Sequence, residues 1–278
     1  MTIIVADTTS SLPLELAAAL GIPMIPQLVI FGENTYRDDT ELTTADFLEK
    51  LKSSRTLPKT AAPPPVFYNP IFEKAARDAE PVIVVAPTGQ MSGTLRSAQT
   101  ARQDFPTADI RVIDTQTIAG SLGALVLVAH DLAKQGKPAD EIETTLRKLL
   151  PRSRTYFVLD TLEYLQKGGR IGAAKALLGE LLQVKPILQL KDGMAAPFEQ
   201  ERTKKRAVAR LIDLVCEQAA ASPAPRLCVM HIDAEDEAQA IRATLSTRLK
   251  LPEIPIYILP PAIVVHAGPK ALAIGFFA

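Results

Sequence analysis

The chain has 278 residues, with 31 basic and 31 acidic side chains, so its formal net charge is zero. Hydrophobic residues make up 47% and charged residues 22%, a globular composition that excludes a disordered or fibrous chain. Proteins that bind nucleic acids usually carry a strong basic surplus, and because this chain has none we expect no nucleic acid partner. The length favours two domains of about 150 residues each.

Cysteine usage and the amino terminus indicate where the protein works. Cys216 and Cys228 are too few for a disulfide framework, which favours a reducing compartment. Residues 1–7 have no basic region and include an acid, which is typical of a strand and not of a signal peptide. The longest mostly apolar stretch, residues 118–129, is shorter than the roughly 20 residues that span a bilayer. We therefore expect a soluble, cytoplasmic protein.

Short apolar runs alternate with helical patterns through the first half of the chain. The predicted strands are residues 2–6, 81–86 and 110–113, and the predicted helices are residues 13–21, 43–51, 94–104 and 117–135. Residues 22–31 are apolar but contain Pro23 and Pro26, so we expect an irregular segment or a sheet edge there. Strands without polar alternation that are joined by helices predict a parallel sheet covered on both faces.

The pattern changes after Pro151, where we predict a boundary between an N-terminal domain (residues 1–152) and a C-terminal domain (residues 153–278). The predicted strands of the second part are residues 156–159, 226–232, 254–259, 263–266 and 273–277, and its predicted helices are residues 162–167, 173–183, 203–220 and 235–249. Asp192-Gly193 is a strong turn signal between two further strand-like runs, residues 184–190 and 194–199. Together these elements predict an α/β protein with a parallel N-terminal sheet and a mixed or antiparallel C-terminal sheet.

Several well-known functional motifs are missing. The sequence contains neither a phosphate-binding loop of the Gly-x-x-x-x-Gly-Lys type nor a Gly-x-Gly-x-x-Gly run after a strand, so neither common nucleotide site is expected. His130, His231 and His266 are scattered without metal-ligand spacing, so we expect no metal site and no cofactor. The Gly-x-Ser-x-Gly nucleophile elbow is also absent. These absences weaken any hypothesis that the chain is an enzyme.

The segment from Thr88 to Thr94 is the first candidate for a binding site, because it follows a buried strand and precedes a helix. In parallel sheets, ligands bind at the carboxyl ends of the strands, where helix N-termini present unpaired N–H groups. Ser92 adds a hydroxyl at this place, and Gly93 lets a ligand approach the backbone. The alternative is that Ser92 or Thr94 only caps the helix.

Three other segments carry candidate polar groups. Four prolines between residues 58 and 65 stiffen the loop that contains Thr60, although Thr60 could equally be a passive turn residue. Two glycines before Arg170 allow a tight turn that aims its guanidinium at a carboxylate or phosphate, and the alternative is a solvated basic turn. His266 follows an apolar run, where a histidine often has a purely structural role.

The candidate segments lie within a longer series of short motifs. In chain order this series is Asp7-Thr8-Thr9-Ser10-Ser11-Leu12-Pro13, Phe31-Gly32, Tyr36-Arg37-Asp38, the loop 58–65, Met91-Ser92-Gly93-Thr94, Ser97-Ala98, Val112-Ile113-Asp114-Thr115, Asp160-Thr161-Leu162-Glu163-Tyr164-Leu165-Gln166-Lys167-Gly168-Gly169-Arg170-Ile171, Lys185-Pro186-Ile187 and His266-Ala267-Gly268-Pro269. The series covers almost the whole chain, and the string from Asp160 to Ile171 is highly specific. In these motifs the sequence resembles the DegV family of bacterial fatty-acid-binding proteins, which includes the lipid-binding subunits of fatty acid kinase.

The resemblance implies a long-chain fatty acid in a buried tunnel between two α/β domains. It implies that Thr60, Ser92 and His266 hold the carboxylate, with Gly93 and Arg170 close by. The chain would not be an enzyme itself, because a separate kinase subunit uses ATP to convert the bound acid to an acyl phosphate for phospholipid synthesis. Arg202 matches the start of a basic segment associated with docking that kinase, and transient contact with a membrane is a further implied partner.

The sequence departs from the family pattern at several positions near the expected head group. Ala61 and Ala62 stand where the family usually has a serine and a glutamine, and Ser11 stands where an aspartate is usual. Lys270 replaces a common glycine and places a cation close in sequence to His266. We therefore expect the contacts around the carboxylate to differ in detail from those of the family.

Physical chemistry is consistent with a fatty acid ligand and leaves two alternatives. Each buried methylene contributes about 0.8 kcal/mol, and a carboxylate is costly to bury unless donors such as two hydroxyls and an imidazole meet it. The first alternative is a stand-alone hydrolase of acyl or phosphoryl esters, with Ser92 as nucleophile and His266 as base, although the sequence identifies no acid to orient the histidine. The second is a phosphocarrier that uses His266.

Overall fold

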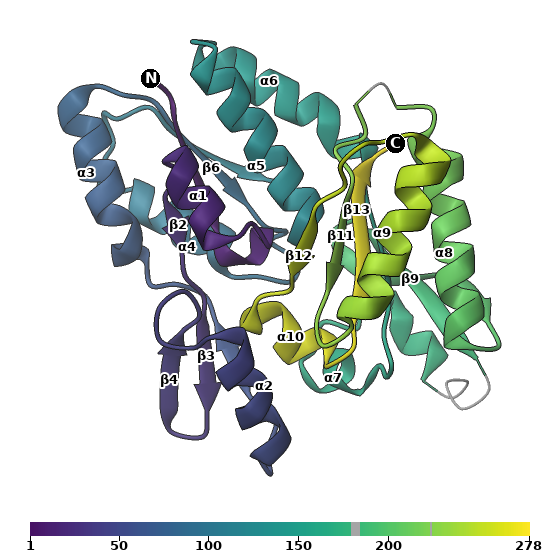
Figure 1. The fold of residues 1–278 in the computed structure, drawn as a ribbon. Coiled ribbons are helices and arrows are strands. Elements are labelled where there is room, and N and C mark those ends of the chain that lie inside the picture. Colours follow the sequence, from purple (N-terminus) through teal and green to yellow (C-terminus); the bar gives the residue numbers. More distant parts are fainter. Residues whose placement is uncertain (179–183, 223) are drawn as a thin grey trace.

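The computed structural model describes residues 1–178, 184–222 and 224–278, which are built around two main sheets (Figure 1). In the first half, four parallel strands are arranged in the order β2-β1-β6-β7. Their bounds are β1 Ile3–Asp7, β2 Met24–Ile25, β6 Val82–Ala86 and β7 Ile110–Asp114. The predicted parallel sheet is confirmed, and β2 lies at its edge as Pro23 and Pro26 indicate.

Both faces of this parallel sheet are buried. Ile4 and Ile83 pack on one side in a core that includes much of helix α5, whereas Val5 and Val84 pack on the other side with residues of α3 and α4. The helices of the first half are α1 Leu14–Leu20, α2 Thr44–Ser53, α3 Asn69–Asp78, α4 Thr94–Arg102, α5 Ala119–Lys134 and α6 Ala139–Leu149, with short 3-10 helices η1 Thr8–Ser10, η2 Pro65–Tyr68 and η3 Leu150–Arg152. The sequence-based assignment lacks α3 and α6.

A third, three-stranded antiparallel sheet was not predicted from the sequence. It consists of β3 Leu28–Phe31, β4 Asn34–Arg37 and β5 Lys59–Ala61, in the order β4-β3-β5. The hairpin between β3 and β4 turns at Gly32, whose φ of 60° lies in the left-handed region that favours glycine. Pairing of Thr60 with Val29 fixes the position of Thr60, so this residue belongs to a strand and not to a free turn.

The second half contains a six-stranded sheet in the order β10-β9-β8-β13-β11-β12. Its strands are β8 Ser153–Val158, β9 Lys185–Lys191, β10 Met194–Glu201, β11 Cys228–His231, β12 Ile256–Ile258 and β13 Leu272–Phe277. All neighbouring pairs are antiparallel except β11 and β12, so the predicted mixed sheet is confirmed. The β9–β10 hairpin turns at Asp192 and Gly193, which both have positive φ, as the turn signal predicts.

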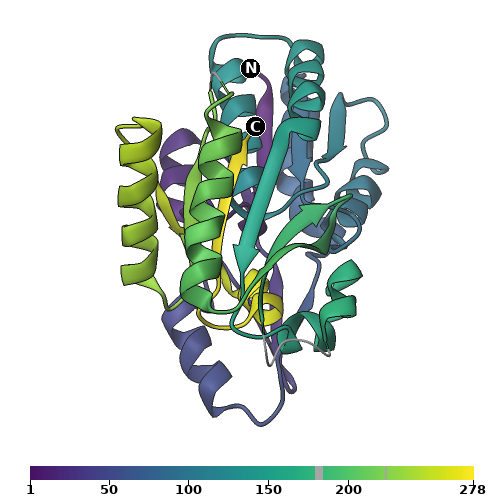
Figure 2. The same cartoon turned by 90° about the vertical axis from the view of Figure 1, so that its right-hand side faces the viewer.

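Helices of the second half cover the outer face of the mixed sheet. Figures 1 and 2 show α8 (Lys204–Ala219) and α9 (Glu235–Leu249) side by side there. Two short helices, α7 (Glu163–Lys167) and α10 (Pro261–Ala267), pack against each other at the end of the sheet. Among the described helices, none combines the length and the apolarity that crossing a membrane requires.

Helix α5 lies between the two main sheets (Figure 1). It contacts both β1 and β13, and a Cβ atom placed on Gly120 would lie 2.1 Å from Cys228 Sγ, so only glycine allows this close approach. One continuous core runs from Ile4 in the first half to Phe277 in the second. The division into residues 1–152 and 153–278 therefore stays a prediction.

Two local assignments in the second half differ from the structure. Residues 263–266 are not a strand, because they lie in helix α10, which starts at Pro261 and is followed by Gly268. Proline at the first helical position and glycine after the last one outweigh the β propensity of the apolar run. Of the helix predicted at residues 173–183, the structure has the 3-10 helix η4 (Gly172–Leu177), and residues 179–183 lie outside the described residues.

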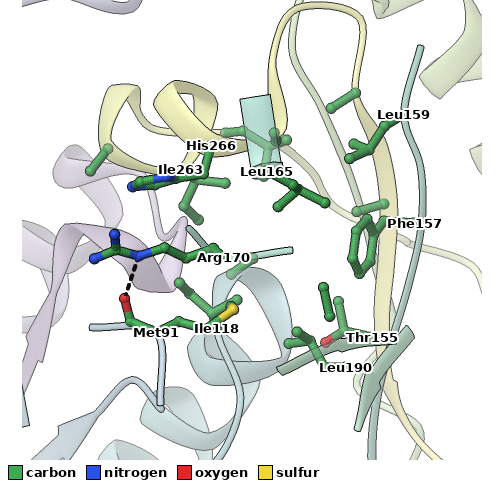
Figure 3. Close-up of a pocket in the computed structure, with 17 residues that line it drawn as sticks. Met91, Ile118, Thr155, Phe157, Leu159, Leu165, Arg170, Leu190, Ile263 and His266 are labelled. Carbon is green, nitrogen blue, oxygen red and sulfur yellow. Dashed lines mark hydrogen bonds between the residues drawn. The ribbon is translucent and has the colours of Figure 1, made fainter. Parts of the chain in front are cut away.

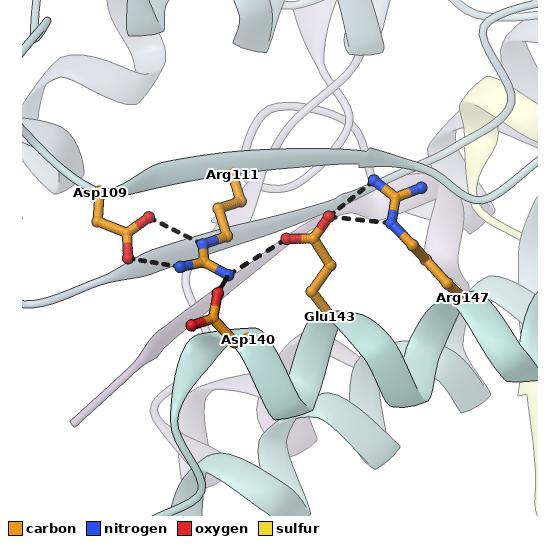
Figure 4. Close-up of polar contacts among 5 residues, drawn as sticks. All are labelled: Asp109, Arg111, Asp140, Glu143 and Arg147. Carbon is orange, nitrogen blue, oxygen red and sulfur yellow. Dashed lines mark hydrogen bonds and ion pairs between the residues drawn. The ribbon is translucent and has the colours of Figure 1, made fainter.

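An ion-pair network holds α6 against the edge strand β7 (Figure 4). The guanidinium of Arg111 contacts Asp109 on the segment before its own strand at 2.8 Å and, on α6, Asp140 at 2.5 Å and Glu143 at 3.3 Å. Arg147 pairs with the same glutamate at 2.7 Å. Because several charges share one partially buried arginine, this network contributes more than an isolated surface pair would.

Candidate functional site

A cavity lies between the two halves of the chain and is lined almost entirely by apolar side chains. Its volume is about 100 Å³, which is room for several water-sized groups. The lining residues are Met91, Ile118 and Ala119 from the first half and Thr155, Phe157, Leu159, Leu165, Arg170, Leu190, Ala195, Leu259, Ala262, Ile263, His266, Ala267, Ala271 and Ala273 from the second.

Polar groups gather at one end of this cavity. Figure 3 shows Arg170 and His266 together at that end, whereas Phe157, Leu159 and Leu190 lie toward the other end. Thr155 also lines the cavity, but its hydroxyl already donates a hydrogen bond to Ser121 Oγ at 2.7 Å. The cavity therefore has one chemically distinct polar end and apolar walls elsewhere.

Helix α10 and strand β5 bring His266 and Thr60 together, although they are 206 residues apart in the sequence. Thr60 Oγ1 and His266 Nε2 form a hydrogen bond of 2.9 Å. His266 Nδ1 is buried and has no hydrogen-bond partner among the described residues. Burial, aided by the positive charge of Arg170, lowers the pKa of His266 to about 4. The imidazole is therefore neutral near pH 7, and its Nδ1 packs against Gly168.

Gly168 allows the close approach of His266. A Cβ atom on Gly168 would lie 2.2 Å from His266 Nδ1, a distance that no side chain tolerates. The first of the two glycines before Arg170 is thus required by packing, whereas Gly169 has a positive φ of 71°. Arg170 donates to Gly168 O at 2.6 Å and to Met91 O at 3.0 Å, and so ties this turn to the segment of Ser92.

Ser92 lies at the start of α4, in the loop that follows β6. Its hydroxyl accepts a hydrogen bond from Thr94 N at 3.2 Å and lies 2.8 Å from Thr94 Oγ1. These contacts agree with the helix-capping interpretation, and they leave room for a ligand role because Ser92 is half-buried. A Cβ atom on Gly93 would lie 3.0 Å from Ala62 Cβ, so the segments of Ser92 and Thr60 touch. The small Ala62 suits this contact.

Of the predicted site residues, Arg170 and His266 line the cavity, whereas Thr60, Ser92 and Gly93 lie behind its lining. Arg202 and Lys270 lie at the surface. Arg202 is exposed at the junction between β10 and α8. Lys270 is exposed, has a positive φ of 57°, and accepts a hydrogen bond from Lys204 Nζ through its carbonyl oxygen. The positive φ explains why glycine suits this position.

The sequence analysis missed a buried polar group behind Ser92. Asp7, Gln27 and Thr94 are only 2%, 4% and 1% exposed, and they form one hydrogen-bonded chain. Asp7 and Thr94 belong to motifs that the sequence analysis singled out, but Gln27 lies in a segment that is otherwise apolar. The only available signal was one amide side chain within that apolar run.

The fold and the cavity define an α/β protein with two main sheets whose interior can enclose an elongated apolar molecule with one polar end. The model "Uncharacterised protein, DegV family" matches residues 1–278. The chain belongs to the DegV family, which confirms the resemblance inferred from its motifs.

Relatives and solved structures are similar along nearly the whole chain. Protein DegV of Bacillus subtilis is 34% identical over 274 residues, which cover 98% of this chain and 97% of that protein. A DegV family protein from Thermus thermophilus, whose structure is described as showing fatty acid binding, has a TM-score of 0.93 at 30% identity and covers 100% of this chain and 99% of its own. The structure of Bacillus subtilis DegV, described as a fatty acid binding protein, has a TM-score of 0.88 at 34% identity with the same coverage.

Proposed function

We propose that this chain binds a long-chain fatty acid in the cavity and presents its carboxylate to a partner ATP-dependent kinase in the cytoplasm, which converts the acid to an acyl phosphate. The observation that supports this proposal best is an apolar cavity with the imidazole of His266 and the guanidinium of Arg170 at one end. Apolar walls with a few polar groups at one place are typical of a site for a ligand with an apolar body and one polar group. The fatty acid binding described for similar DegV structures supports the same ligand class.

The electrostatics of the polar end suit a carboxylate. His266 is neutral near pH 7 because its pKa is lowered to about 4. The hydrogen-bonded pair of Thr60 and His266 therefore keeps one proton for the ligand, and Ser92 supplies a second, without a locked ion pair. Arg170 lines the cavity beside the imidazole and supplies positive charge close to the anion. This arrangement satisfies the carboxylate oxygens and leaves the positive charge of Arg170 available for the phosphate that the kinase would add.

The geometry does not favour a stand-alone hydrolase. A serine nucleophile needs its base within hydrogen-bond reach, but the side-chain hydrogen bonds of Ser92 within the described residues go to Thr94, and His266 Nε2 is bonded to Thr60. A phosphocarrier role for His266 is disfavoured for a related reason, because one ring nitrogen is occupied and the other is buried.

The first test is direct detection and titration of the ligand. We expect mass spectrometry of organic extracts of the purified protein to show long-chain fatty acid, and the delipidated protein to bind hexadecanoate. Ser92→Ala should weaken this binding roughly 5- to 150-fold, because loss of one hydrogen bond to a charged group costs about 1–3 kcal/mol. Ser53→Ala, which removes an exposed hydroxyl on α2, is the matched control and should leave the affinity unchanged.

Absence of any acyl chain in the extract, together with no binding by the delipidated wild-type protein, would contradict the proposed function. Equal affinity of wild type and Ser92→Ala would contradict the assignment of Ser92 alone. The two outcomes are separate because the first concerns the cavity and the second only its polar end.

A second test concerns the kinase. We expect Arg202→Ala to weaken binding to the catalytic subunit of a bacterial fatty acid kinase by about fivefold or more, since arginines at interface hot spots commonly contribute more than 1 kcal/mol. Hexadecanoate affinity should not change, because Arg202 is exposed and does not line the cavity. Arg242→Ala, an exposed arginine on α9, is the control. Equal kinase affinity of the wild type and both variants, measured by calorimetry, would remove Arg202 from the proposed interface.

A further inference from the structure

We propose that Gln27 is a positioning residue for the head-group site: acting through Thr94, it directs the hydroxyl proton of Ser92 outward, so that Ser92 donates to the bound carboxylate. This inference rests on the proposed function and names a residue that acts behind the site. It follows from a chain of hydrogen bonds whose donors and acceptors can be assigned one after the other.

The chain of hydrogen bonds starts at the end of β1 and finishes at Ser92. Gln27 Nε2 lies 2.7 Å from Asp7 Oδ2 and 2.9 Å from Thr94 Oγ1. Thr94 Oγ1 in turn lies 2.8 Å from Ser92 Oγ. Asp7, Gln27 and Thr94 are at most 4% exposed, so water does not compete for these contacts. The three residues thus link the first strand of the parallel sheet to the polar end of the cavity.

The orientation of the Gln27 amide follows from Asp7. The carboxyl group of Asp7 also accepts a hydrogen bond from Thr9 Oγ1 at 2.6 Å, so donors approach it from both sides. When Asp7 is ionised, above its pKa of about 7, an amide oxygen at the position of Gln27 Nε2 would face a carboxylate oxygen with no proton between the two acceptors. The amide nitrogen therefore faces Asp7, and its second proton points at Thr94 Oγ1.

The orientation of the Gln27 amide determines where the hydroxyl protons of Thr94 and Ser92 point. Because Thr94 Oγ1 accepts from Gln27, its own proton has two acceptors near it, Ser92 Oγ at 2.8 Å and the more distant Asp7 carboxyl, and the nearer one receives it. Ser92 Oγ also accepts from Thr94 N, so both of its lone pairs are used. A hydroxyl has two acceptor sites and one proton, and that proton is left for a ligand. A carboxylate can only accept hydrogen bonds, so it binds Ser92 only when the Ser92 proton points toward the ligand.

Without the amide donor, the direction can reverse. Thr94 could then accept a proton from Ser92, whose oxygen would meet the carboxylate with lone pairs instead of a proton. The titratable groups around Asp7 among the described residues are Asp38 and Tyr68. Burial raises the pKa of both, and the negative charge of Asp7 adds to the effect. Asp38 does not take part in the hydrogen bonds between Asp7, Gln27, Thr94 and Ser92. It accepts hydrogen bonds from the backbone N–H of Gln27 and from the hydroxyl of Thr8.

The test compares two ligands with the same tail, hexadecanoate and hexadecanol. At pH 8, where Asp7 is ionised, Gln27→Met should weaken hexadecanoate binding about tenfold. Thr94→Val, which is nearly isosteric, removes the acceptor for the Ser92 proton and should weaken hexadecanoate binding less than threefold. Both variants should bind hexadecanol within twofold of the wild type, because an alcohol both donates and accepts and so pairs with either direction of Ser92. Thr94→Ser keeps the hydroxyl and should also bind hexadecanoate within threefold of the wild type.

A double-mutant cycle identifies the route of the effect. In a Ser92→Ala background, Gln27→Met should cause no further loss of hexadecanoate affinity, because the oriented hydroxyl is already gone. An equal tenfold loss in that background, or parallel losses for hexadecanoate and hexadecanol, would overturn the inference and indicate a general disturbance of the cavity. If the wild-type protein binds no hexadecanoate at all, the proposed function itself fails, which is a different result from wild-type binding that Gln27→Met leaves unchanged.

Discussion

Gly168→Ala should weaken fatty acid binding about a hundredfold while both main sheets stay folded. The added methyl group would lie 2.2 Å from His266 Nδ1 and 2.9 Å from the backbone oxygen of Tyr164. The backbone of Gly168, at φ −79° and ψ −5°, is available to alanine, so the conflict is with His266 and not with the local conformation. His266 must move, which breaks its bond to Thr60 and displaces the one proton that this pair offers to the carboxylate. Loss of a hydrogen bond to a charged group costs up to about 3 kcal/mol, which corresponds to a loss of affinity of about a hundredfold.

Gly169→Ala is the matched control. No atom lies within 4 Å of its Cβ position, but its φ of 71° is unfavourable for alanine. This variant should lose about 1–2 kcal/mol of stability and keep its affinity for hexadecanoate. In a His266→Ala background, Gly168→Ala should cause little further loss of affinity, because the clash is then relieved. Wild-type affinity in Gly168→Ala alone would show that His266 has no part in the head-group site. Isothermal titration provides the affinities, and circular dichroism checks the fold.

Much of the fold could be predicted because its signals are local. The buried strands β1, β6 and β7 are continuous apolar runs, and helix-start and helix-stop residues mark the segments between them. The Asp192-Gly193 turn is similarly explicit, because only a few residue types adopt two successive positive φ values. Features of this kind depend on a few neighbouring residues, and tertiary contacts do not override them.

The site was harder to predict because its geometry depends on contacts between distant segments. Thr60 and His266 form their hydrogen bond only because an unpredicted strand and an unpredicted helix meet. The apolar residues before His266 have the composition of a strand, but Pro261 before them and Gly268 after them favour the helix that they form. Gln27 gives no local signal of its role, since its partners lie 20 and 67 positions away. The motifs indicated which residues to consider but not how they act together.

Asp7→Asn should raise the free energy of unfolding at pH 8 by several kcal/mol and leave it nearly unchanged at pH 4. Burial raises the pKa of Asp7 from 3.8 to about 7, outweighing the hydrogen bonds that lower it. Between these two values the folded state holds a proton that the unfolded state has released, so the contribution of Asp7 to stability falls as the pH rises from about 4 to 7. At about 1.4 kcal/mol per pKa unit, the full loss approaches about 4 kcal/mol. The asparagine avoids this loss because it carries no charge, and its oxygen can still accept from Gln27.

Two other groups affect how the free energy of unfolding of the wild type depends on pH, and their contributions must be separated from that of Asp7. Burial also raises the pKa of Asp38 to about 7, so Asp38 destabilises the protein over the same pH range and with the same sign. His266 acts in the opposite direction, because its pKa is lowered from 6.5 to about 4 and its contribution is lost as the pH falls through that range. The contribution of Asp7 is therefore clearest as the difference between Asp7→Asn and the wild type in denaturant titrations at pH 4 and pH 8.

Exposed Asp104 provides the control, since Asp104→Asn should show no pH-dependent gain. Equal stability of Asp7→Asn and the wild type at pH 8 would contradict the raised pKa of Asp7.

A gain at pH 8 would mean that the chain keeps a buried acid at a measurable cost in stability, behind the polar end of its cavity. An asparagine would satisfy the core at lower cost, but its amide can rotate and present a donor to Gln27, whereas an ionised carboxylate can only accept. The cost in stability is then the physical consequence of fixing the direction in which the Ser92 hydroxyl donates.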